Sequence, residues 1–184
     1  MSNEKSLIKQ LTTRINGLSL VSKSANFSTK LMIANGIFNS KLCNLIQLWG
    51  GTEDYLLKSL QVTQNKVMRV VTGMCWFTPS GVLWLSVKQL VAYHTLMTVQ
   101  KTVLSASPIY LSEKLCQSNH DHYTWQIVKF DDKFEGKTER SKKSFCYRGA
   151  IQYNMLPIEI RSSMSLQSYK RKIKWWIMRN VTVD

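Results

Sequence analysis

Apolar residues recur at spacings of three and four along most of this chain, and that period constrains its fold more than any other feature. In the clearest stretch they form one helical face that ends at Gly50-Gly51: Phe27, Leu31, Ala34, Phe38, Leu42, Leu45 and Trp49. This spacing predicts one long, largely buried helix, because residues three and four apart share one side of an α-helix. Paired glycines leave the helical conformation at little steric cost, so they predict its end.

The same period predicts further helices over residues 7–18, 52–73, 82–104, 108–115, 145–156 and 166–177. Thr52 is expected to cap the helix that ends at Gly73, whose second face carries Lys58, Gln61, Asn65 and Arg69. Residues 116–143 lose the period and are expected to form a polar linker, with one short strand where residues 125–130 alternate. The fold class expected from these patterns is mainly α.

Positive charge gathers at the two ends of the chain. The formal net charge is +14 over 184 residues. Residues 1–70 hold nine Lys/Arg against three acids, residues 71–136 hold five of each sign, and residues 137–184 hold eleven bases against three acids. Two basic blocks around a neutral middle favour surfaces that face a polyanion such as RNA or DNA, although a basic composition that only aids solubility is the simpler alternative.

The final expected helix combines charge with an indole that its apolar stripe does not need. Lys170 and Lys174 share one row of the helix, with Arg171 and Trp175 on the next row. Cations beside an aromatic plate suit a nucleic-acid strand, since bases stack on the ring and phosphates pair with the charges. Two alternatives are a solvated basic face with Trp175 covering a neighbouring helix, and binding to an anionic membrane surface.

Motifs that would indicate an enzyme or a metal site are weak. Asp131-Asp132 follow Phe130 directly, without the spacing of a polymerase metal turn. Cys116, His120 and His122 lack a fourth zinc ligand at a familiar spacing, and His94 has no partner placed to make it a base. We therefore expect no catalytic residue, no metal and no cofactor.

No run of 18 apolar residues occurs, and the first five residues carry no apolar signal core. Both features predict that the chain has no membrane partner and stays inside the cell, in the cytoplasm or the nucleus.

Several short stretches, in order, resemble the region that follows the polymerase core in reverse transcriptases of jockey-like non-LTR retrotransposons. They are Asn35-Gly36-Ile37-Phe38 with Leu48-Trp49-Gly50-Gly51, then Gln64-Asn65 before Lys66, Trp84-Leu85-Ser86-Val87-Lys88-Gln89-Leu90, Ser107-Pro108-Ile109-Tyr110-Leu111, and Tyr153-Asn154-Met155-Leu156-Pro157. Two departures are Tyr153, where the family usually has Trp, and Asn44, which replaces a frequent aromatic residue.

The resemblance implies a helical thumb-like bundle over residues 1–115, the linker over 116–143, and a smaller basic helical region over 144–184. It implies a chain that is not an enzyme by itself, because the fingers, the palm and the catalytic aspartates of an RNA-directed DNA polymerase would lie before residue 1.

We expect a non-catalytic portion that grips template-primer or element RNA. The residues expected to contact RNA or DNA are Lys66, Arg69, Lys142, Lys143, Arg148, Lys170, Arg171, Lys172, Lys174 and Trp175. The alternative is a helical protein-interaction module, derived from a retroelement, that pairs with itself or with a polymerase core.

Overall fold

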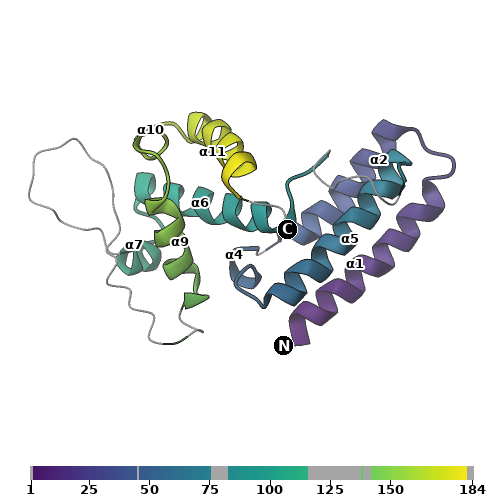
Figure 1. The fold of residues 1–184 in the computed structure, drawn as a ribbon, viewed down its shortest axis with the longest axis horizontal. Coiled ribbons are helices and arrows are strands. Elements are labelled where there is room, and N and C mark those ends of the chain that lie inside the picture. Colours follow the sequence, from purple (N-terminus) through teal and green to yellow (C-terminus); the bar gives the residue numbers. More distant parts are fainter. Residues whose placement is uncertain (1, 45, 76–82, 116–137, 139–141, 182–184) are drawn as a thin grey trace, which may run out of the picture. The chain divides into compact units, whose positions relative to one another are not determined.

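The described residues of the computed structural model form a mainly helical protein, as the apolar period predicts (Figure 1). The structure describes residues 2–44, 46–75, 83–115, 138 and 142–181. The chain divides into two compact units, residues 1–90 and residues 91–184. Residues 91–115 thus belong with the C-terminal unit, which differs from the expected organisation because their apolar side chains pack on the C-terminal helices.

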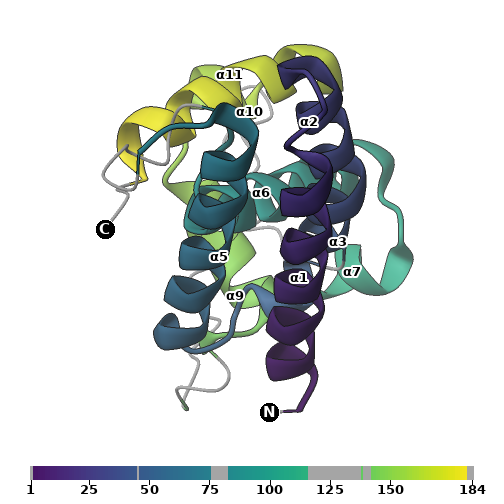
Figure 2. The ribbon, with the colours of Figure 1, turned by 90° about the vertical axis from the view of Figure 1, so that its right-hand side faces the viewer.

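Unit 1 is a helical layer in which α1 (Ser2–Val21) and α5 (Asp54–Thr72) run side by side in the same direction (Figures 1 and 2). The segment between them runs back in the opposite direction as α2 (Phe27–Ala34), a π-helical turn η1 (Asn35–Asn39) and α3 (Ser40–Cys43). Their shared core includes Leu11, Phe38, Leu42, Leu60 and Val67. The apolar stripes therefore face one another, as the spacing predicts.

The expectation of one uninterrupted helix over residues 27–49 was wrong. Asn44 adopts an extended conformation with ψ of 121°, and a separate short helix, α4 (Ile46–Trp49), follows it. The Trp49 indole N–H donates to the carbonyl oxygen of Asn44 at 3.1 Å, which satisfies a backbone group that the broken helix would otherwise leave open.

The two ends of α5 follow different rules. Gly73 ends the helix in the left-handed conformation, with φ of 69°, and its N–H donates to the Arg69 carbonyl oxygen at 2.8 Å. Glycine suits this position because it carries no Cβ. At the other end the N-cap is Glu53 and not Thr52, so the predicted cap was wrong by one residue.

Unit 2 is organised around α6 (Val87–Ser105), whose residues from 91 onwards belong to it. Its core joins α6 to α7 (Ile109–Lys114), α9 (Phe145–Asn154), α10 (Ile158–Arg161) and α11 (Leu166–Asn180). Ser144 and Ser165 are the N-cap residues of α9 and α11, so both helices begin where the sequence predicts. The short α10 was not expected.

Buried polar side chains link the helices of unit 2. The Tyr153 hydroxyl donates to Oε1 of Gln100 at 2.8 Å, and the Gln100 side-chain amide donates to the Ser163 carbonyl oxygen at 3.0 Å. The Tyr169 hydroxyl donates to the Leu96 carbonyl oxygen at 3.3 Å. Since an unpaired buried polar group is costly, these bonds fix how α9 and α11 lie against α6.

Gly149 permits the close approach of α9 to α6. A Cβ added at this position would lie 2.9 Å from Cγ2 of Val99, closer than real Cβ atoms come to a neighbour. The linker strand expected over residues 125–130 lies outside the described residues. None of the described helices is long and apolar enough to cross a membrane.

Candidate nucleic-acid interface

Half of the ten expected contact residues lie on α11. Tyr169, Ile173 and Ile177 are completely buried and hold the helix on its unit, while Lys170, Arg171 and Lys174 are exposed on the other side. The helix contains five Lys or Arg and no acid. In the part of the chain that the structure describes, the three exposed cations have no hydrogen-bond or ion-pair partner, so their charge faces solvent.

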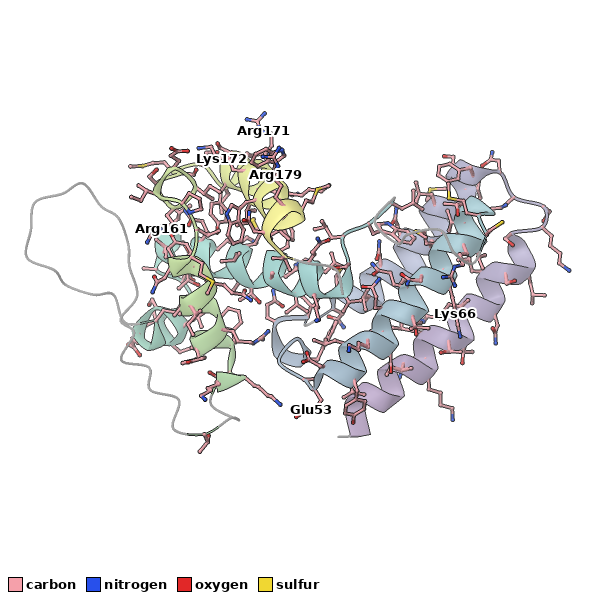
Figure 3. All side chains as sticks on the ribbon, in the orientation of Figure 1. Glu53, Lys66, Arg161, Arg171, Lys172 and Arg179 are labelled. Atoms are coloured by element: carbon pink, nitrogen blue, oxygen red, sulfur yellow. The ribbon has the colours of Figure 1, made fainter. Side chains whose placement is uncertain are left out.

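Trp175 lies on this face and is largely exposed, whereas one alternative had it covering a neighbouring helix. Its side chain is 58% exposed, and the Cζ atom of the Arg179 guanidinium lies 3.7 Å from the centroid of its ring. An arginine over an indole face is a favourable cation–π contact. Figure 3 labels Arg171, Lys172 and Arg179 on α11. We call Lys170, Arg171, Lys174, Trp175 and Arg179 the α11 basic face.

Arg179 was absent from the expected contact residues. The sequence contained a signal for Arg179, because Trp175 and Arg179 are four residues apart and neighbours on a helix.

Lys172 was an expected contact residue, but its side chain bonds within the fold. Its Nζ donates to the Glu159 carbonyl oxygen at 3.0 Å and to the Ser163 hydroxyl at 3.3 Å. Lys172 therefore ties α11 to α10, and its ammonium is the least available of the expected contacts on this helix.

One of the expected contact residues near the start of α9, Arg148, makes a hydrogen bond within the fold. Arg148 is half-buried and its Nε donates to the Lys143 carbonyl oxygen at 3.2 Å. Burial lowers the pKa of the Arg148 guanidinium, because desolvation disfavours its charged form. Lys142 is exposed and Lys143 is half-buried. Arg148 thus orders the backbone just before α9, a role that the sequence did not suggest.

Lys66 and Arg69 belong to the other unit, on α5. Lys66 is exposed and is labelled in Figure 3. Arg69 is half-buried. The expected contact residues consequently fall into two sets, Lys66 and Arg69 in unit 1 and the other eight in unit 2.

Gln61 and Gln64, also on α5, hold the start of α6. Oε1 of Gln61 accepts from the Val87 N–H at 2.7 Å, and the Gln64 side-chain amide donates to the Leu85 carbonyl oxygen at 3.0 Å. Gln61 also donates to Gln64 at 3.1 Å and to Asn65 at 2.8 Å. These amides are therefore a structural network within unit 1 and not a binding surface.

Ser86 and Gln89 complete that network. The Ser86 N–H donates to Oε1 of Gln89 at 3.0 Å, and the Gln89 N–H donates to the Ser86 hydroxyl at 3.3 Å. This reciprocal pair is a capping box, which Ser and Gln three residues apart indicate in the sequence. It explains why α6 begins at Val87 and not at Val82, where the apolar stripe starts.

Among the described residues, no group of three His, Cys, Asp or Glu side chains could hold a metal ion. Asp131, Asp132, Cys116, His120 and His122 lie outside the described residues. His94 is half-buried with its ring edge-on to Tyr93, at a centroid distance of 5.3 Å. Burial, and then the charge of Lys101, lower its pKa, so the neutral imidazole is favoured.

The chain matches no protein-family model, no curated protein and no solved structure.

Proposed function

We propose that this chain binds RNA or DNA through the α11 basic face and catalyses no reaction itself. The observation that carries the proposal is a helix with five cations and no acid, anchored by three completely buried residues and presenting Lys170, Arg171 and Lys174 to solvent. Exposed cations on a fixed helix attract phosphates and release the counterions that surround a nucleic acid.

The resemblance of the sequence to a known family supplies the biological context of this proposal. The chain resembles the thumb and post-thumb region of a jockey-like reverse transcriptase, so we propose that it is a C-terminal portion of such a polymerase. There it would grip template-primer or element RNA inside the cell, while catalysis would belong to a palm that precedes it.

Salt dependence of binding tests the proposal directly. We expect the purified chain to bind fluorescein-labelled single-stranded RNA and DNA, measured by anisotropy from 50 to 300 mM KCl. Each phosphate contact contributes about 0.7 to the slope of log affinity against log salt for single strands. Several contacts therefore give a slope of about −2 or steeper, and a flat response would refute phosphate binding.

A charge-matched pair of variants locates the binding surface. Lys170→Glu/Lys174→Glu reverses two cations of the α11 basic face, and Lys9→Glu/Lys23→Glu reverses two exposed cations of unit 1. The net charge changes equally in both. We expect the first variant to weaken binding at least tenfold and to flatten the salt slope, and the second to change affinity less than threefold. Equal losses would show that only net charge matters.

A second candidate is the protein-interaction module. Large apolar side chains are exposed around α10, where Met155 is 67%, Ile158 is 53% and Met164 is 81% exposed. Exposed apolar groups favour association with another protein surface. If the chain pairs with itself, sedimentation velocity will show a concentration-dependent dimer that Met164→Lys disrupts and Lys170→Glu/Lys174→Glu leaves intact.

A further inference from the structure

Trp175 and Arg179 form a stacked pair that the fold does not require. The guanidinium Cζ lies 3.7 Å from the ring centroid and covers one face of the indole, yet 58% of the Trp175 side chain remains exposed. The indole thus has a cation over one face, and more than half of the residue is open to solvent. Such a surface can accept one further planar group.

The pair is held on a rigid support. Ile173 and Ile177 flank Trp175 along the helix and are completely buried. The hydroxyl of Tyr169, six residues earlier in the helix, donates to the Leu96 carbonyl oxygen at 3.3 Å. Lys172 fixes the helix to α10. Because Trp175 adds little to this packing, its exposed surface is available to a ligand and its loss should leave the helix in place.

The cations around the pair define what kind of planar group fits. Lys170, Arg171 and Lys174 lie within one or two turns of Trp175 and carry no partner among the described residues. A ligand that stacks on the indole while its neighbouring groups meet these cations must be both planar and anionic along its length. A nucleotide strand has this chemistry, because each base is flanked by phosphates.

We infer that the Trp175–Arg179 pair is a stacking platform for one unpaired base, and that it makes the α11 basic face prefer single-stranded RNA or DNA over a duplex. This inference rests on the proposed nucleic-acid binding and adds the class of ligand. In a duplex both faces of a base are already stacked, and pulling a base out costs a few kcal/mol. A single strand offers its bases without that cost.

The platform should also tolerate any base. Every base has a flat π face, and stacking requires no hydrogen bond between the Trp175–Arg179 pair and the edge of the base. The Arg179 guanidinium carries several N–H donors, so while it lies over the indole it can still meet a phosphate.

The experiment compares two probes in the same buffer at 100 mM KCl. One is a 12-nucleotide single strand, and the other is a 12-base-pair duplex with both ends closed by polyethylene glycol linkers, so that no terminal base face is exposed. Loss of one stacked base is worth about 1–3 kcal/mol, which is about a 5- to 150-fold change in Kd. We expect Trp175→Ala to weaken single-strand binding within that range and duplex binding less than twofold.

Three further variants separate stacking from charge. Trp175→Phe keeps an aromatic ring and should retain more than half of the preference, expressed as the ratio of the two Kd values. Arg179→Lys keeps the charge but loses the planar stack, so it should lower the preference while duplex affinity stays within twofold. Tyr110→Ala removes another exposed aromatic residue, on α7, and should change neither Kd.

The outcomes distinguish this inference from the proposed function. If the chain binds the single strand and Trp175→Ala changes neither Kd, or weakens both equally, nucleic-acid binding stands and the platform is refuted. If the unmodified chain binds neither probe, both proposals fail. Co-sedimentation with phosphatidylserine vesicles that Trp175→Ala abolishes, without binding to either probe, would assign the pair to a membrane surface instead.

Discussion

Helices α5 and α11 are both amphipathic and both basic, yet they use their polar residues in different ways. On α5 the polar side includes Gln61, Gln64 and Asn65, which bond to one another and to the start of α6. On α11 the polar side presents Lys170, Arg171 and Lys174 to solvent. A polar helix face thus indicates a binding surface only where packing has not already engaged its side chains.

Both helices are anchored by a stripe of buried apolar residues, and shortening one of these side chains should have the largest effect on stability. Leu60 on α5 is 2% exposed and Ile173 on α11 is completely buried. Each substitution by Ala should lower the free energy of unfolding by about 2–5 kcal/mol, because it removes buried methylene groups and leaves a cavity. Urea denaturation followed by circular dichroism measures this. Lys174→Ala is the exposed control, expected within about 0.5 kcal/mol.

Gln64→Met tests whether the amides of α5 are structural. Gln64 is 3% exposed, and Met keeps its length but removes the donor to the Leu85 carbonyl oxygen and the acceptor for Gln61. We expect a loss of about 1–3 kcal/mol, the usual cost of leaving buried polar groups unpaired. Lys66→Met, on the exposed side of the same helix, should change stability by less than about 0.5 kcal/mol. Equal effects would contradict the structural role.

Tyr153→Phe tests the buried hydrogen bond that joins α9 to α6. The hydroxyl donates to Gln100 in the core, so its removal should cost about 1 kcal/mol at pH 7. Burial raises the pKa of Tyr153 to about 12, against an ordinary value of 10. The folded chain therefore holds this proton more tightly than the unfolded chain does. The resulting stabilisation is complete below pH 10 and is lost as the pH rises towards 12.

The measurable consequence is a difference in pH dependence. Stability measured from pH 8 to 11.5 should fall more steeply in the unmodified chain than in Tyr153→Phe, by up to about 1.4 kcal/mol per pH unit above pH 10. Tyr55→Phe, at a residue that is 53% exposed, serves as the control and should follow the unmodified chain. Parallel curves for all three proteins would contradict the assignment of this effect to Tyr153.

The smallest effects separate two lysines on α11 itself. Lys172→Met removes the bonds to Glu159 and Ser163, and should cost about 0.5 kcal/mol of stability with the salt slope of binding unchanged. Lys170→Met should leave stability unchanged and reduce the salt slope by about 0.7, which is one phosphate contact. The reverse pattern would show that Lys172 is the true contact.

Much of the fold could be predicted because helices are local. The period of apolar residues located α1, α5, α6 and α11, Gly73 marked the end of α5, and the predicted helix starts at residues 145 and 166 were correct. The break at Asn44 could not be predicted, because the apolar period continues through it. The start of α6 was missed although Ser86 and Gln89 carry a recognisable capping box.

The candidate interface was only partly predictable for a similar reason. Charge and spacing indicated that Lys170, Arg171, Lys174 and Trp175 share a face, which the structure bears out as exposure on one side of α11. The use of Lys172 and Arg148 within the fold was not visible, since their partners are backbone carbonyl groups and a serine hydroxyl, which charge patterns do not indicate.

The sequence by itself determined that this chain is helical, that its helices carry buried stripes, and that its last helix is basic on one side. These properties depend on residue spacing within a few turns. Only the tertiary structure decided which polar groups are engaged by packing, because those partners are distant in the chain. Gln64 meets Leu85 across 21 residues, and Gln100 meets Ser163 across 63. The compact packing of helices brings such segments together, and the cations left outside it form the surface proposed to bind nucleic acid.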